Sequence, residues 1–138
     1  MKTTLAFAIL FFISQAFAQQ PTSEFPASAS AFLAQELPQM EAAVTAKDRN
    51  YFSGGLERMQ TFLNSWGLNS PSSLALDTYP ACTEAVSDFL IAGLCKISPP
   101  GTICEPDTFL PKVAANIAAC NELAGLTHHS SGTPNGAP

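Results

Sequence analysis

Apolar residues recur at intervals of three and four positions along much of the chain, and this spacing is typical of one face of an α-helix. The first such segment begins after Ser28 or Ser30, either of which can cap a helix, and an extended lead-in over residues 19–27 precedes it. Because Pro38 lies inside the segment and lacks a backbone donor, we expect a kink there or two short helices that meet. The apolar positions are Leu33, Leu37, Met40 and Val44.

A second helix is predicted after Ser53-Gly54-Gly55, because paired glycines favour the end of one helix and the start of the next. Gly67 stands directly after it, where a residue with positive φ often ends a helix. Ser70-Pro71 then predicts one further turn over residues 72–76. The apolar face of the second helix consists of Leu56, Met59, Phe62, Leu63 and Trp66.

Two longer helices are predicted in the C-terminal half. The first runs from Pro80 to about Gly93, and the second is capped by Asp107 and runs from Thr108 to about Ala124. No segment alternates between apolar and polar residues over the length of a strand. The pattern therefore predicts an all-α fold, a compact bundle of about four helices within residues 28–126.

The four cysteines all lie in the C-terminal half, and their even number favours two disulfides. If residues 80–95 are helical, Cys82 and Cys95 lie roughly 19 Å apart at ~1.5 Å per residue, too far for a disulfide. The two helices joined by a Pro-Pro-Gly loop should form an antiparallel hairpin, which predicts the nested pairs Cys82–Cys120 and Cys95–Cys104. No Cys-x-x-Cys spacing occurs, and we expect no metal site.

Both ends of the chain differ in composition from the helical region. Residues 1–18 combine Lys2, an uncharged apolar run and Ala16-Phe17-Ala18, which is the pattern of a cleaved signal peptide. We therefore expect a secreted protein whose mature chain begins at Gln19 and contains no membrane span. Residues 127–138 are polar and rich in small residues, which predicts a disordered tail.

Charge narrows the classes of partner. The whole chain has a formal net charge of −5, and loss of Lys2 with the signal makes the mature chain more acidic. Nucleic acid and anionic lipid are poor partners for such a surface. The expected partner is an apolar small molecule or an extracellular protein, and no cofactor is expected.

The sequence offers little that resembles a catalytic centre, and we predict no catalytic residues. Its two histidines, His128 and His129, are adjacent in the polar tail. Glu84 and Asp88 lie one helical turn apart and are formally able to act as acid and base, but a solvated helix face explains them more simply. An acid-acting hydrolase is therefore a weaker hypothesis than the two binding functions given below.

The remaining candidates are adaptable apolar residues that are able to contact a ligand between helices. Small residues of the last helix favour a groove there, although the same alanines also permit close helix packing. They are Ala114, Ala115, Ala118 and Ala119. The predicted ligand-binding residues are Met59, Leu63, Trp66, Phe89 and Ile117. We expect a secreted, non-enzymatic carrier of a small apolar ligand; the alternative is a secreted effector, toxin or inhibitor that binds a host or competitor protein through an exposed helix face.

Overall fold

The computed structural model describes the backbone of residues 20–130 and the side chains of residues 20–126, and within this range helices joined by turns and loops form the fold, with no strand. This confirms the predicted all-α fold. The predicted signal peptide and residues 131–138 lie outside the described residues. The elements are η1 (Thr22–Glu24), α1 (Phe25–Ala46), α2 (Asn50–Ser65), α3 (Leu74–Thr78), α4 (Pro80–Ile97) and α5 (Pro106–Ser130).

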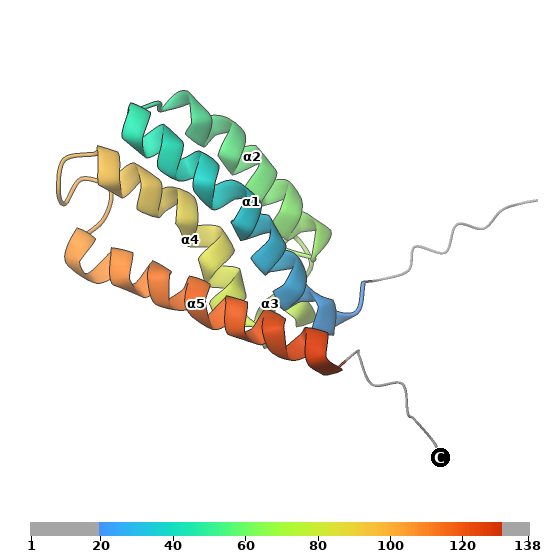
Figure 1. Ribbon diagram of the computed structural model, residues 1–138. Coiled ribbons are helices and arrows are strands. Elements are labelled where there is room, and N and C mark those ends of the chain that lie inside the picture. Colours follow the sequence, from blue (N-terminus) through green and yellow to red (C-terminus); the bar gives the residue numbers. More distant parts are fainter. Residues whose placement is uncertain (1–19, 131–138) are drawn as a thin grey trace, which may run out of the picture.

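Helix α4 is the centre of the bundle. Figure 1 shows it between α5 on one side and the pair formed by α1 and α2 on the other. Because neighbours cover it on several sides, α4 buries residues around most of its circumference rather than along a single stripe. These residues are Cys82, Ala85, Val86, Phe89, Leu90, Ala92, Gly93 and Cys95.

The predicted break at Ser53-Gly54-Gly55 is wrong, because α2 begins at Asn50 and passes through both glycines. Gly55 faces α4 so closely that a Cβ atom there would lie 2.9 Å from a methyl carbon of Leu90. A glycine inside a helix costs about 0.5–1 kcal/mol relative to alanine, and here it permits close packing of α2 on α4. Tertiary contact therefore outweighs local helix propensity at this position.

The first helix also begins earlier than predicted. Residues 22–27 are helical rather than extended, because η1 leads directly into α1 at Phe25. Pro26 falls in the first turn, where the missing donor has no cost, and the fully buried Phe25 packs its ring edge-on against Trp66 at 5.2 Å. At Pro38 the helix continues as one element and is not split into two.

Several helix ends differ from the prediction by a few residues. Gly67 ends α2 with φ of 95°, as predicted, but Ser73 rather than Ser70 caps the short α3 by accepting a hydrogen bond from the Leu76 amide. Helix α4 extends beyond Gly93 to Ile97. Helix α5 begins at Pro106 and includes residues 127–130, which are therefore helical rather than part of a disordered tail.

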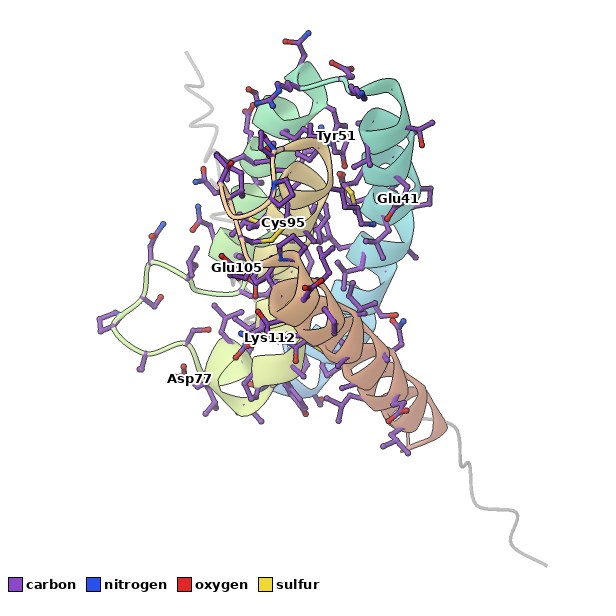
Figure 2. All side chains as sticks on the ribbon, turned by 90° about the vertical axis from the view of Figure 1, so that its left-hand side faces the viewer. Glu41, Tyr51, Asp77, Cys95, Glu105 and Lys112 are labelled. Carbon is purple, nitrogen blue, oxygen red and sulfur yellow. A yellow bond between two sulfur atoms is a disulfide. The ribbon has the colours of Figure 1, made fainter. Side chains whose placement is uncertain are left out.

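The predicted disulfides are confirmed. Cys82 and Cys120 are fully buried with Cα atoms 4.7 Å apart, and they join the start of α4 to the second half of α5. Cys95 and Cys104 join the end of α4 to the loop before α5, with Cα atoms 5.7 Å apart, and Figure 2 shows this bond in yellow. The two bonds hold α4 and α5 as the expected antiparallel hairpin.

Candidate functional site

A groove opens where α1 and α5 diverge. The start of α1 lies against the second half of α5: the Ser30 hydroxyl donates to Asn121 Oδ1 at 2.7 Å, and Cys120 Sγ lies 4.0 Å from the Pro26 carbonyl oxygen. The two helices separate toward the other end of the bundle, and α4 lies between them (Figure 1). The resulting groove has a volume of about 450 Å³, which falls in the range of about 300–1,000 Å³ typical of small-molecule sites.

Apolar side chains from three helices form the groove. Its floor is part of the core, since Met40, Phe89 and Val113 are each no more than 2% exposed. Partly exposed residues form the walls, and Ala114 contributes only a methyl group, which leaves the space open. The wall residues are Leu37 of α1 and Leu110, Ala114 and Ile117 of α5.

Two charged residues complete the groove lining. Glu41 of α1 and Lys96 of α4 form an ion pair, with side chains 53% and 35% exposed. Figure 2 labels Glu41 on α1, at the right of the view. Because both side chains are well solvated, the pair contributes little to stability but presents a donor and an acceptor at the edge of an apolar surface.

The five predicted ligand-binding residues do not form one cavity. Phe89 and Ile117 both line the groove, while Trp66 lines a different pocket. Leu63 is 2% exposed and Met59 packs against the core, and neither lines the groove or the Trp66 pocket.

The sequence analysis missed other groove residues. The signal for Leu37 and Met40 was their place among the apolar positions of the first helix. The signal for α5 was its small side chains, of which Ala114 lines the groove. Glu41 and Lys96 carried no local signal, because they lie 55 positions apart and meet only in the fold.

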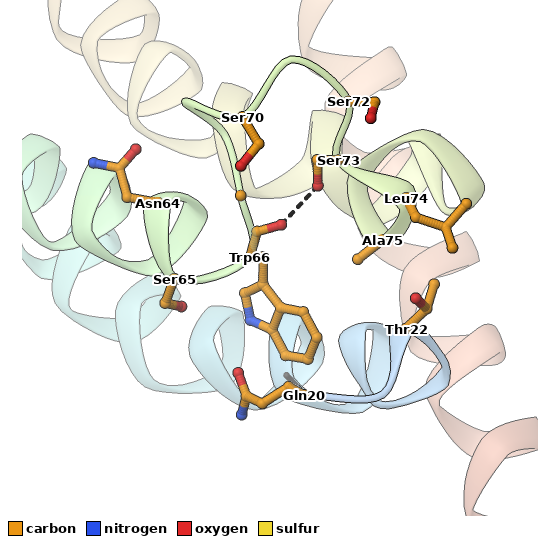
Figure 3. Close-up of a pocket in the computed structure, with 11 residues that line it drawn as sticks. Gln20, Thr22, Asn64, Ser65, Trp66, Ser70, Ser72, Ser73, Leu74 and Ala75 are labelled. Carbon is orange, nitrogen blue, oxygen red and sulfur yellow. Dashed lines mark hydrogen bonds between the residues drawn. The ribbon is translucent and has the colours of Figure 1, made fainter. Parts of the chain in front are cut away.

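The second pocket lies where the end of α2, the following loop, the start of α3 and the chain before α1 meet. Its volume is about 460 Å³, and most of its lining side chains carry a hydroxyl or amide. Figure 3 shows these side chains around Trp66, together with the hydrogen bond that Ser73 donates to the Trp66 carbonyl oxygen at 2.6 Å. The lining residues are Gln20, Thr22, Asn64, Ser65, Trp66, Gly67, Ser70, Ser72, Ser73, Leu74 and Ala75.

Glu84 and Asp88 lie on α4 beside Lys112 of α5. Lys112 Nζ is 2.8 Å from a Glu84 carboxylate oxygen and 3.9 Å from Asp88, and the hydrogen bond from Lys112 lowers the pKa of Glu84. Burial raises the pKa of Asp88, and the charge of Lys112 opposes this effect. Asn116 also donates to Glu84 at 3.0 Å, so the cluster ties α4 to α5 across the surface of the hairpin.

A buried carboxylate that the sequence analysis did not single out joins α1 to α2. Glu36 is 3% exposed and accepts hydrogen bonds from Arg58 Nε at 2.6 Å, from Arg58 Nη2 at 2.8 Å and from the Tyr51 hydroxyl at 2.8 Å. The hydrogen bonds from Arg58 lower the pKa of Glu36, whereas burial and the neighbouring carboxylate raise the pKa of Tyr51 to about 12. The carboxylate is fully satisfied, and the cluster acts as a clamp between the two helices.

One pattern in the sequence indicates this clamp. Glu36 lies three positions after Leu33 and four before Met40, on the stripe that faces the core. A charged residue on such a stripe is rarely buried without a partner.

Among the described side chains, those of residues 20–126, no group of three or more histidine, cysteine, aspartate or glutamate residues is placed to hold a metal ion. The helices of this part of the chain also include none that is both long and apolar enough to cross a bilayer. No protein-family model matches the chain, and no curated protein or solved structure shows significant similarity to it.

Proposed function

We propose that the protein is a secreted, non-enzymatic binding protein that carries a small apolar ligand in the groove between α1, α4 and α5. The observation that supports this most directly is the continuous apolar floor, in which Met40, Phe89 and Val113 lie at the base of an open groove. An apolar ligand on this floor would cover the partly exposed wall residues Leu37, Leu110 and Ile117 and remove their apolar surface from water, and that gain drives binding.

The groove favours a ligand with one polar end. Glu41 and Lys96 are its charged lining residues, so a carboxylate or hydroxyl is able to bind there while a hydrocarbon chain lies on the floor. A single-chain fatty acid or alcohol has this form. We expect affinities in the micromolar range or weaker, because apolar contact has to offset the entropy lost on association.

Two features support an extracellular location. Cys82–Cys120 and Cys95–Cys104 are stable in oxidising compartments, and the pattern of residues 1–18 is that of a secretory signal.

The alternative hypothesis, an effector that docks through an exposed helix face, receives less support. Among the described residues, the exposed large apolar side chains come one each from separate helices and loops rather than from one helix face. They are Leu56, Leu68, Leu74, Ile91, Ile103 and Leu126.

Isothermal titration calorimetry of the oxidised mature protein with dodecanoate tests the proposal. Ala114→Phe places a ring in the groove and should weaken binding by about tenfold or more, which corresponds to about 1.4 kcal/mol. Ala115→Phe is the matched control, because Ala115 is an exposed alanine on the same helix outside the groove, and binding should be retained. Absence of binding by the parent protein, or equal loss in both variants, would contradict the proposal.

A further inference from the structure

The Trp66 pocket differs from the groove in the chemistry of its lining. None of its lining residues is charged, and eight of its side chains carry a hydroxyl, an amide or an indole N–H. A charged ligand would lose its hydration there without meeting an opposite charge, and an apolar ligand would leave the polar groups unpaired. The pocket therefore favours a neutral ligand that forms many hydrogen bonds.

Part of the polar lining is already used by the fold. Ser73 bonds to Trp66 and caps α3, Ser65 donates to the Phe62 carbonyl oxygen at 2.6 Å, and Asn64 Oδ1 accepts from Asn69 at 2.8 Å. These bonds fix the shape of the pocket before any ligand arrives, which lowers the cost of binding.

Other lining groups have no partner among the residues that the structure describes. Within the described residues, the hydroxyls of Thr22, Ser70 and Ser72 form no hydrogen bond, nor do the side-chain amide of Gln20 and the amide nitrogen of Asn64. Hydroxyl and carboxamide groups both donate and accept, as the hydroxyls of a sugar do.

The indole of Trp66 adds a directional donor. The residue is 7% exposed, and its ring forms a T-shaped contact with the ring of Phe25. Its Nε1–H makes no hydrogen bond with the described residues, and none of their fully buried side-chain nitrogens or oxygens lacks a partner. The indole nitrogen is thus accessible, and it donates without accepting.

We infer that this pocket is a second binding site, separate from the apolar groove, and that its ligand is a neutral mono- or disaccharide. A volume of about 460 Å³ suits a small ligand. The free donors and acceptors come from three segments of the chain: the residues before α1, the end of α2 and the loop that follows it (Figure 3).

Saturation-transfer-difference NMR on the oxidised mature protein tests the inference with glucose, galactose, mannose, N-acetylglucosamine and their common disaccharides. At least one sugar should bind, and glucuronate should bind more weakly than glucose because the pocket contains no cation. Trp66→Phe removes the N–H and keeps an aromatic ring, and it should weaken binding about two- to tenfold, the range expected for one hydrogen bond.

Ser70→Ala/Ser72→Ala provides a variant that leaves the core untouched, and it should also weaken binding. Ser53→Ala/Ser98→Ala is the matched control, since both serines lie outside the pocket, and it should bind as the parent does. Dodecanoate should not displace the sugar, so this inference and the proposed function fail separately. Absence of binding by every sugar, insensitivity to both pocket variants, or displacement by dodecanoate would overturn the inference.

Discussion

The two sides of the bundle are held together by different means. Two disulfides cross-link α4 to α5 and the loop before it. Helix α2, by contrast, lies on α1 and α4 without a covalent bond, held by apolar contacts and by the Glu36–Arg58–Tyr51 clamp. The hairpin is therefore stabilised by restriction of the unfolded chain in addition to its folded-state contacts, whereas α2 depends on contacts in the folded state alone.

This difference matters because each candidate site depends on one side. Two of the three helices that form the groove, α4 and α5, belong to the disulfide-linked hairpin, and the third is α1. The Trp66 pocket is built largely from the end of α2 and the loop after it. Perturbing the hairpin should therefore affect the groove, and perturbing the clamp should affect the Trp66 pocket.

The largest expected effect is loss of the longer disulfide. Cys82→Ala/Cys120→Ala opens a loop of 38 residues and should lower the free energy of unfolding by about 3–4 kcal/mol on the loop-entropy model. Cys95→Ala/Cys104→Ala opens a loop of 9 residues and should cost about 2–3 kcal/mol. Urea denaturation of both variants measures the difference, and a greater loss for the shorter loop would contradict the entropic account.

Removing the cation of the clamp should have a smaller but clear effect. Arg58→Met leaves the buried Glu36 carboxylate with Tyr51 as its side-chain donor, and we expect a loss of about 2–3 kcal/mol. The figure is below that for a fully buried pair because the Arg58 side chain is 44% exposed.

Arg49→Met is the control for this prediction. Arg49 is an exposed arginine beside the start of α2 and makes no ion pair with the described residues. Its replacement should change the free energy of unfolding by less than about 0.5 kcal/mol. Equal losses in the two variants would show that the clamp does not hold α2 in place.

Acid should weaken the clamp selectively. The pKa of Glu36 is lowered in the folded state from an ordinary value of 4.5, chiefly by the hydrogen bonds from Arg58. Its contribution to stability is therefore present above pH 4.5 and is lost as the pH falls through the folded-state pKa. Hydrogen exchange should show α2 losing protection relative to α4 in this range, and Glu36→Gln should abolish that pH dependence. An unchanged pH response in Glu36→Gln would assign it to other carboxylates.

The same contrast explains what the sequence predicts and what it does not. The cysteine pairing sets the register of α4 against α5, and Phe89 of α4 and Ile117 of α5 line the same groove. No disulfide fixes the position of α2, and Trp66 lines a pocket separate from the groove that contains Phe89 and Ile117. Long-range constraints, rather than local patterns, determine which distant residues meet.

Local patterns also fail where a distant contact reverses their usual meaning. The pair Gly54-Gly55 predicts a helix break, yet the close approach of Leu90 makes Gly55 suitable inside α2. Glu36 interrupts the apolar stripe of the first helix, yet its partner Arg58, which lies 22 positions away on the next helix, allows it to be buried. Both failures concern α2, the side of the bundle that is defined only by folded-state contacts.

The smallest expected effect concerns the connection between α1 and α2. Lys47 adopts φ of 53° at the end of α1, a left-handed conformation that costs a side-chain-bearing residue roughly 1–2 kcal/mol. Glycine avoids this strain but loses more entropy on folding, so Lys47→Gly should raise the free energy of unfolding by about 0.5–1 kcal/mol. Asp48→Gly is the control, because it removes a carboxylate that accepts from the Asn50 amide at 3.0 Å, and it should destabilise. If both variants have a lower free energy of unfolding in urea, the strain energy at Lys47 is smaller than the entropic cost of ordering glycine. The position of α2 would then depend still more on the Glu36–Arg58–Tyr51 clamp.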